Sequence, residues 1–487
     1  RPRGGARVRG GVTPPPPRDR RPRPTAPTNR PVEERDDVSQ LQPRPDLGDP
    51  RPYTFPRHRR LSVGGGEIVA LNVPGQKYAS IRLVLPNGGA YEPADRRGVT
   101  MLTGEALEDG VHGDNSLAPE LEQHGADWVC YATWDSFVAG VDAPTTRIGD
   151  ATRLFAEAVR APALRDEDVL RRRDQVLEGF WLEASRPSRL AMRAIGGQLF
   201  SGRYATPLSG APVALQDVTP DMVRDFHRST VAAAAGTLVV VGDLDGVDLE
   251  EMGRTVFGGA EPARRPAEST PEAAPHDLPR VLLVDRPDSV QSAIVLAQRA
   301  PSRSAIDLPR ADGMSEVLGG MFTSRLNMEL RERLGYTYGV GSRFDLRRDS
   351  GVFLISTQVD TPTTAPSVTA ALEQIRRLQE GGVTGEELEA VRQSNTVGLP
   401  VTYSNARSMA HALVEMVVHD LPEDHVDRLR AGFDALTAAD LDTAAREYLD
   451  PAAMALIVVG DAARLKDPLG EAGFGEVDVR APENLWN

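Results

Sequence analysis

One stretch of this chain occurs twice, and that repeat constrains the fold more than any other feature. Residues 215–243 match residues 433–461 without a gap, so that Thr219 aligns with Thr437. Each copy has the pattern of a helix that begins at a capping threonine, then a loop, then a buried strand that ends at Gly-Asp. The repeat predicts two tandem units of mixed helices and strands, which is an α+β fold built twice.

The remaining chain divides around these two copies. A length of 487 residues exceeds what one hydrophobic core usually organises. The Pro-, Glu- and Ala-rich stretch 258–279 is typical of a linker, which leaves an N-terminal half at 53–257 and a C-terminal half at 280–487. Residues 1–52 are rich in Arg and Pro and lack periodic apolar positions, so we expect disorder there. This segment is either a plain extension or a basic arm for an acidic partner.

The N-terminal half has alternating strand and helix signals. The apolar runs 67–73 and 79–85 are predicted to pair as a hairpin around a turn at Pro74–Gly75. Further strands are predicted at 126–133 and 136–142, and helices at 98–109, 116–124, 150–160 and 166–200, the last interrupted near Pro187.

Composition excludes several classes of protein. The net charge of −14 argues against a nucleic-acid-binding protein, whose affinity depends on clustered cations. No stretch is long and apolar enough to cross a bilayer, so we expect no membrane association. The single cysteine, Cys130, excludes an internal disulfide and is expected to be a small buried side chain. No signal peptide or anchor is visible, and a cytoplasmic protein is the simplest expectation.

Two tandem halves that each end in Val-Val-Gly-Asp resemble the insulinase/pitrilysin metallopeptidases. The resemblance is strongest to their short bacterial and processing-peptidase branch, and it covers about residues 55–465. It implies that the two α+β halves form a clamshell unit. It also implies that two such units, on one chain or on two, enclose a chamber for an unfolded peptide.

Active members of this family carry His-x-x-Glu-His on a helix of the first half. The two imidazoles, one turn apart, bind one zinc ion, and the Glu activates the metal-bound water. In RGVTMLTGEALEDG, Met101 takes the place of the first His, Gly104 that of the Glu and Glu105 that of the second His. The third ligand, an acidic residue eight positions before a proline, aligns with Gly179. We therefore expect no zinc ion in this chain.

The second half keeps a different part of the family pattern. The stretch SRLNMELRERLGYTYGVGSRF resembles the one that carries the family's substrate-binding arginine and tyrosine, which here are Arg331 and Tyr338. The resemblance implies that both side chains contact substrate in the opposite unit and stabilise the developing oxyanion. Gly335 is predicted to form the turn between them. Tyr336 is a rival, and strand alternation would place it on the same face as Tyr338. Without the resemblance, there is an alternative interpretation in which Arg331 is a solvated charge on a helix and Tyr338 is a core aromatic residue in a strand.

Two further patterns allow two interpretations each. His411, Glu415 and His419 have i, i+4 and i+8 spacing, which suits a second metal site or the polar flank of a helix. The pair Gly319–Gly320 suits backbone flexibility near substrate or tight packing between helices.

The lost zinc positions and the retained Arg331 and Tyr338 predict the zinc-free subunit of a heterodimeric metallopeptidase, inactive alone. Its partner, a homologous subunit with His-x-x-Glu-His, would hold zinc and the general base. Bacterial complexes that trim leader peptides from ribosomally made natural products are the nearest analogy. The alternative is a non-enzymatic peptide-binding or scaffold subunit, resembling the core proteins of respiratory complexes. A self-sufficient hydrolase is the third reading, and it would cleave peptides even in the presence of a chelator.

Overall fold

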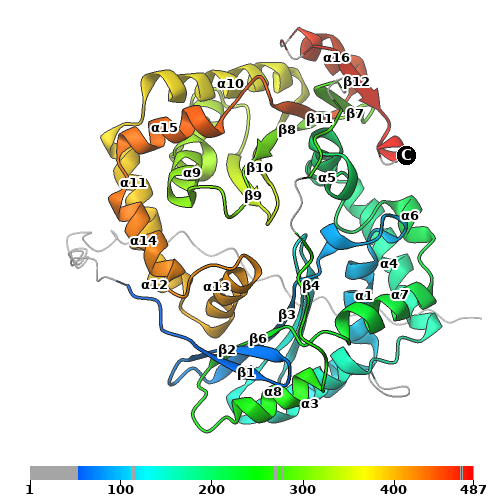
Figure 1. Ribbon diagram of the computed structural model, residues 1–487. Helices are drawn as coiled ribbons and strands as arrows, with labels where there is room; N and C mark the ends of the chain where they lie inside the picture. The colour runs from blue at the N-terminus through cyan, green and yellow to red at the C-terminus, as the bar shows by residue number, and fades with distance from the viewer. Residues whose placement is uncertain are drawn as a thin grey trace, which may run out of the picture. The chain divides into compact units, whose positions relative to one another are not determined.

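The computed structural model describes most of the chain, and Figure 1 shows its helices and strands. The predicted Arg/Pro-rich segment 1–52 lies outside the described residues, as do parts of the predicted linker 258–279. The described residues form two six-stranded sheets, one in each predicted half. They comprise residues 53–110, 116–267, 271–275, 279–471, 473 and 475–485.

The first sheet has the strand order β1-β2-β6-β3-β5-β4. The strand β6 is parallel to β2 and antiparallel to β3, so it separates these two strands. The predicted hairpin between 67–73 and 79–85 is therefore wrong. The run of valines in β6 is apolar on both faces, and such a strand is stable only in the centre of a sheet. The strands are β1 (Arg59–Val63), β2 (Gly66–Asn72), β3 (Tyr78–Leu85), β4 (Asp127–Ala132), β5 (Phe137–Pro144) and β6 (Thr237–Gly242).

The second sheet repeats the first with one change at its edge. Its order is β12-β7-β11-β8-β10-β9, and β11 is parallel to β7 and antiparallel to β8. The strands β6 and β11, which end the two copies of the repeat, thus take equivalent central positions. The strands are β7 (Val281–Asp285), β8 (Gln291–Ala300), β9 (Val340–Leu346), β10 (Gly351–Asp360), β11 (Ala455–Gly460) and β12 (Val477–Arg480).

The helices confirm the predicted caps and breaks. Thr219 and Thr437 both cap a helix by accepting a hydrogen bond from a first-turn N–H group. Pro187 starts α5, where its missing N–H costs nothing. The helices of the first half are α1 (Val99–Ala106), α2 (Leu117–Gln123), α3 (Ile148–Arg160), α4 (Asp166–Ala184), α5 (Pro187–Leu199), α6 (Pro212–Gln216), α7 (Pro220–Phe226) and α8 (Leu249–Phe257).

The second half adds eight α-helices in the described residues, and π-helical turns occur in both halves. These α-helices are α9 (Leu308–Ser315), α10 (Thr364–Gly381), α11 (Gly385–Thr396), α12 (Leu399–Thr402), α13 (Ala406–Val418), α14 (His425–Ala435), α15 (Ala438–Tyr448) and α16 (Ala462–Gly470). The π-helical turns are η7 (His227–Val231), η8 (Glu316–Gly320) and η9 (Asn327–Arg333). No helix in the described part of the chain has the length and apolar character needed to cross a membrane.

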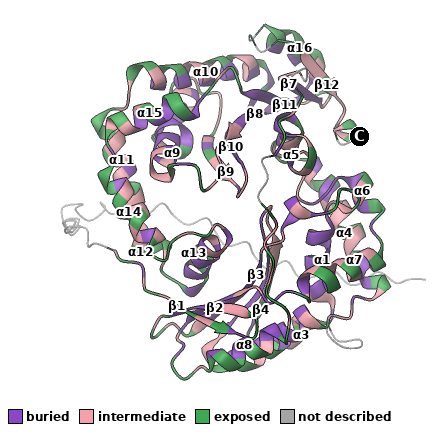
Figure 2. Ribbon diagram, in the orientation of Figure 1, coloured by how far each residue is buried: buried purple, intermediate pink, exposed green. Residues whose placement is uncertain are grey.

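Each sheet is covered on one face by a helix from the other half. The helix α5 of the first half packs on β8 and β11, and α13 of the second half packs on β3 and β6. Leu190 and Ile195 of α5 belong to the second sheet's apolar cluster, and Leu413 and Val414 of α13 belong to the first sheet's cluster. Figure 2 shows these strands and the inner faces of both helices as buried. The exchange joins the halves through apolar contacts, each buried aliphatic side chain contributing about 1.5–3 kcal/mol.

A buried charge network lies under α13. Asp142 of β5 is fully buried and accepts hydrogen bonds from Ser80 Oγ at 2.6 Å and Arg82 Nη2 at 2.8 Å. Arg407, in the first turn of α13, reaches the second carboxylate oxygen of Asp142 at 2.8 Å. The network therefore links the two halves by charge as well as by apolar packing.

Candidate functional site

Three of the four positions aligned with the zinc motif lie together. The helix α1 begins after Gly98, whose φ of +96° is in the left-handed region that glycine tolerates. Met101 and Glu105, one helical turn apart on α1, line a cavity of about 440 Å³. Gly179, on α4, lines the same cavity. The structure thus brings these three residues to one cavity.

The fourth position, Gly104, faces the sheet and not this cavity. A Cβ atom on Gly104 would lie 2.9 Å from Sγ of Cys130 and 3.3 Å from Cε2 of Phe137. Cys130 is on β4 and packs against the core from a half-buried position. Burial raises the pKa of its thiol, so the thiol stays neutral. Side chains of the sheet therefore fill the space that a general base would need at Gly104.

These residues do not fit a zinc ion. Protein zinc sites use imidazole, thiolate and carboxylate ligands. Met101 offers only a thioether and Gly179 offers no side chain. The Glu105 carboxylate lies 3.8 Å from Nη1 of Arg172, which Asp109 also holds through hydrogen bonds of 2.6 and 2.7 Å. Within the described ranges, no group of three or more His, Cys, Asp or Glu side chains is placed to hold a metal ion.

Arg331 lies near the end of η9, about one third exposed. Its guanidinium carbon is 4.3 Å from the centroid of the Phe322 ring, and its Nε is 3.5 Å from Oε1 of Glu332. The contact with Phe322 is a cation–π interaction, which restrains the direction of the guanidinium group. Gly335, with a φ of +65°, forms the predicted turn after η9.

Tyr336 and Tyr338 point to different environments, which corrects the expectation that both lie on one face. The residues between η9 and β9 are not in a strand, so strand alternation does not apply to them. Tyr336 packs against the core of the second half, and its N–H donates to the Leu330 carbonyl at 2.9 Å. Tyr338 is 95% exposed. Its side chain is therefore free to contact another molecule, whereas that of Tyr336 is committed to the core.

The predicted arginine and tyrosine lie away from the lost zinc positions. Tyr338 lines a separate cavity of about 310 Å³ with Met192 of α5 and Thr357 of β10. In the described part of the chain, no hydrogen bond joins Arg331 to Tyr338. The structure thus brings Met101, Glu105 and Gly179 to one cavity, whereas Tyr338 lines another. Arg331 does not line either of these two cavities.

The two ambiguous patterns have simple structural settings. Nε2 of His419 lies 3.5 Å from Oε2 of Glu415. His411 lines a different place, a cavity of about 790 Å³ beside β4. This arrangement suits the polar flank of a helix. A Cβ atom on Gly319 would lie 2.8 Å from the Ser342 backbone nitrogen. Gly319 therefore serves tight packing, although of η8 against β9 and not between two helices.

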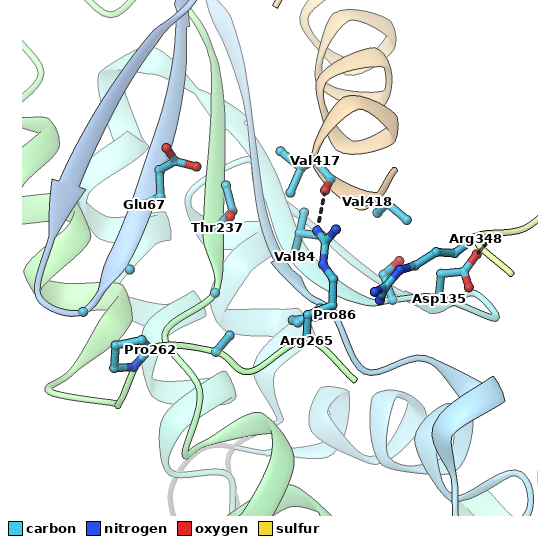
Figure 3. Close-up of a pocket in the computed structure, with 15 residues that line it drawn as sticks. Glu67, Val84, Pro86, Asp135, Thr237, Pro262, Arg265, Arg348, Val417 and Val418 are labelled. Carbon is cyan, nitrogen blue, oxygen red and sulfur yellow. Dashed lines mark hydrogen bonds between the residues drawn. The ribbon is translucent and has the colours of Figure 1, made fainter. Parts of the chain in front are cut away.

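One further cavity, of about 310 Å³, was not visible in the sequence because distant segments line it (Figure 3). Arg265 donates to the Val417 carbonyl at 3.0 Å, and the Arg348 N–H donates to Asp135 at 2.9 Å. Burial raises the pKa of Asp135. Arg348 also donates a hydrogen bond to the Pro266 carbonyl. Both arginines are therefore held by hydrogen bonds within the chain, and these bonds connect the linker to both halves around the cavity.

Comparison with known proteins begins with two family models. Residues 67–196 match Insulinase (Peptidase family M16), and residues 217–395 match the Peptidase M16 inactive domain. Together the two matches cover more than half of the chain. The chain belongs to the insulinase family. The residues at the positions aligned with the zinc motif and its third ligand are Met101, Gly104, Glu105 and Gly179.

Insulinase-family relatives match over long stretches. A protein named uncharacterized zinc protease from Mycobacterium tuberculosis is 24% identical over 420 residues, which cover 84% of this chain and 94% of that protein. The alpha subunit of mitochondrial-processing peptidase from Solanum tuberosum is 22% identical over 256 residues, covering 52% of this chain and 46% of that subunit.

Solved structures confirm the predicted α+β fold of two tandem insulinase-like halves. A peptidase M16 inactive domain from Pseudomonas fluorescens has a TM-score of 0.76 at 24% identity, and it covers 83% of this chain and 98% of that chain. A protease from Helicobacter pylori has a TM-score of 0.75 at 16% identity, with 83% and 100% covered.

Proposed function

We propose that this chain is the zinc-free subunit of a two-chain metallopeptidase that processes peptides. A homologous partner with His-x-x-Glu-His would hold the zinc ion and the general base. This chain would supply Arg331 and Tyr338 to the substrate. The observation that carries the proposal is the exposure of Tyr338 in a chain whose own motif positions do not fit zinc.

The segment that carries Tyr338 is anchored although the side chain is exposed. Thr337 Oγ1 accepts a hydrogen bond from the Gly339 N–H at 3.1 Å, and Thr357 Oγ1 on β10 lies 2.9 Å from Thr337 Oγ1. An aromatic side chain that leaves a fixed backbone for solvent is typical of contact residues at interfaces. Phe322 and Met328, 67% and 49% exposed, extend this apolar surface around Arg331. A partner subunit would cover it.

The side chains of Arg331 and Tyr338 suit the chemistry of acyl transfer. Arg331 carries a permanent positive charge and Tyr338 a neutral O–H donor. Both stabilise negative charge on the carbonyl oxygen as water attacks a peptide bond, and such donors act most strongly in the transition state. In the partner, zinc would polarise that carbonyl and activate the water. The exposed edges of β4 and β9 offer backbone groups to which an extended peptide can add as a strand.

Kinetics of the reconstituted two-chain complex test the proposal. Tyr338→Phe removes only the hydroxyl and is expected to lower kcat about 100-fold, as loss of an oxyanion donor does. Tyr336→Phe, in the core, and Arg333→Ala, an exposed arginine paired with Glu329, are the matched controls and should retain activity. Leader peptides of ribosomally made natural products are the first substrates to try.

Either of two results would contradict this assignment. Full activity of the Tyr338→Phe complex would remove the role given to the pair. A stable complex that binds peptides but cleaves none would instead support the scaffold alternative.

A further inference from the structure

The helix α5 carries a row of arginines along one face. Arg186 is the N-cap residue, and Arg189 and Arg193 follow at i+3 and i+7, a spacing that aligns all three. The helix contains no acidic residue. Cations in the first turn oppose the helix macrodipole, so helix stability does not account for Arg186 and Arg189.

Two of these arginines have no internal partner. Arg186 and Arg189 are exposed, and across the described residues neither guanidinium group forms an ion pair or a hydrogen bond. Exposed arginines on other helices are commonly paired one turn away, as Arg153 is with Glu157 at 3.2 Å on α3. The chain has a net charge of −14, so the row of arginines on α5 forms a local region of positive charge on an acidic protein.

Three adjoining cavities run along α5. The first, of about 440 Å³, contains the lost zinc positions and Arg186. The second, of about 340 Å³, is lined by Arg189 and shares Arg193 with the first. The third, of about 310 Å³, contains Tyr338 and shares Met192 with the second. We call this continuous surface the α5 groove.

Buried hydrogen-bond donors lie in the second cavity. Arg347 is 6% exposed, and its Nε and Nη1 atoms have no hydrogen-bond partner in the described part of the chain. The hydroxyl of Tyr204, a fully buried residue, also has none. The Arg347 guanidinium stacks on Trp134 at 4.6 Å. Unpaired buried donors are costly, and an acceptor such as a carboxylate that enters the cavity and reaches these atoms would remove that cost.

The acidic residues that face the groove are already neutralised. Glu183 pairs with Arg193 at 2.5 Å, and Asp345 pairs with Arg347 at 2.9 Å. Glu105, in the first cavity, lies beside Arg172. Among the described residues that line the groove, the charged groups left without a partner are therefore the guanidinium groups of Arg186 and Arg189.

We propose that the α5 groove binds an acidic segment of an extended peptide, with one carboxylate side chain in the cavity of Arg347 and Tyr204. This proposal rests on the peptide-processing function above and assigns its substrate class. Arg186 and Arg193 are about 10 Å apart along the helix axis, which about three residues of extended peptide span.

Binding by the isolated chain tests the proposal without requiring cleavage. The probe is a fluorescein-labelled peptide with three adjacent glutamates, and its counterpart carries glutamines in their place. Fluorescence polarisation at low salt is expected to show tighter binding of the glutamate peptide, and high salt should reduce the difference by screening. The double variant Arg186→Gln/Arg189→Gln should weaken binding of the glutamate peptide about fivefold, the effect of two exposed ion pairs. Arg153→Gln, on α3, is the matched control and should bind as the unaltered chain does.

A second variant tests the buried donors. Tyr204→Phe keeps the ring and removes the unpaired hydroxyl, and it should also weaken binding of the glutamate peptide. Equal affinity for the two peptides, or binding unchanged in both variants, would overturn the proposal. Displacement of the peptide by an equal concentration of a single-stranded oligonucleotide would overturn it as well, in favour of a general polyanion site. If the glutamate preference holds but no complex with a partner cleaves any peptide, the proposed function fails and the binding groove stands.

Discussion

Gly104 offers the sharpest test of how the lost zinc site is packed. A methyl group at this position would lie 2.9 Å from Cys130 Sγ and 3.3 Å from Phe137 Cε2. Gly104→Ala gains about 1 kcal/mol of intrinsic helix propensity. It also overpacks the contact between α1 and β4, which typically costs about 1–3 kcal/mol. We therefore expect the single variant to be less stable than the unaltered chain, by up to about 2 kcal/mol.

The partner substitution Cys130→Ala removes the Sγ atom and with it the closest contact. In that background Gly104→Ala should stabilise the protein, because the helix propensity remains and most of the overpacking is gone. Equilibrium urea unfolding of the four proteins in this double-mutant cycle gives the coupling energy, expected at about 1–3 kcal/mol. Effects that add within about 0.5 kcal/mol would refute the packing described here. The same contact predicts that restoring His, Glu and His at 101, 104 and 105 will not rebuild a zinc site while Cys130 remains.

Two further predictions concern buried charge. Asp142→Ala should lower the free energy of unfolding in urea by about 3–5 kcal/mol, because buried Arg82 loses its partner, whereas Asp434→Ala at the surface should cost less than about 1 kcal/mol. Burial raises the pKa of Glu316 from 4.5 to about 7, so the folded state binds this proton more tightly than the unfolded state does. The contribution of Glu316 to the free energy of unfolding is therefore fully present below about pH 4 and is lost as the pH rises through 7. The loss amounts to about 3 kcal/mol. Glu316→Gln, which can still accept from Asn395, should remove that part of the pH dependence in urea unfolding, and an unchanged profile would contradict the assignment.

Local signals in the sequence predicted elements well and strand pairing less well. The helix breaks at Pro187 and the caps at Thr219 and Thr437 depend on nearby residues, and the structure has all of them. The false hairpin between 67–73 and 79–85 has a different origin. The position of β6 between those strands depends on a parallel pairing with residues far along the chain, and a turn signal carries no information on that pairing. The boundaries 53–257 and 280–487 stay a prediction.

In the candidate site, too, some features could be predicted from the sequence and others depend on tertiary packing. The resemblance to the insulinase family aligned Met101, Glu105 and Gly179 with the three zinc ligands, and the structure brings these residues to one cavity. The different settings of Tyr336 and Tyr338 could not be predicted, because they depend on a segment between η9 and β9 that is not a strand. The arginine row of α5 was readable at i, i+3 and i+7, but its lack of acidic partners is a tertiary property. Arg347 and Tyr204 meet in one cavity only through the packing of α5 on the second sheet.

The proposed function requires a zinc-bearing partner before this chain can act on peptides. The most direct measurement is cleavage of a fluorogenic peptide by the purified chain, alone and mixed with a His-x-x-Glu-His homologue. We expect no cleavage by the chain alone. In the mixture we expect more cleavage than the homologue gives alone, and a chelator should abolish it. Cleavage by the chain alone that survives the chelator would contradict the proposed function. A mixture no more active than the homologue alone would contradict it equally.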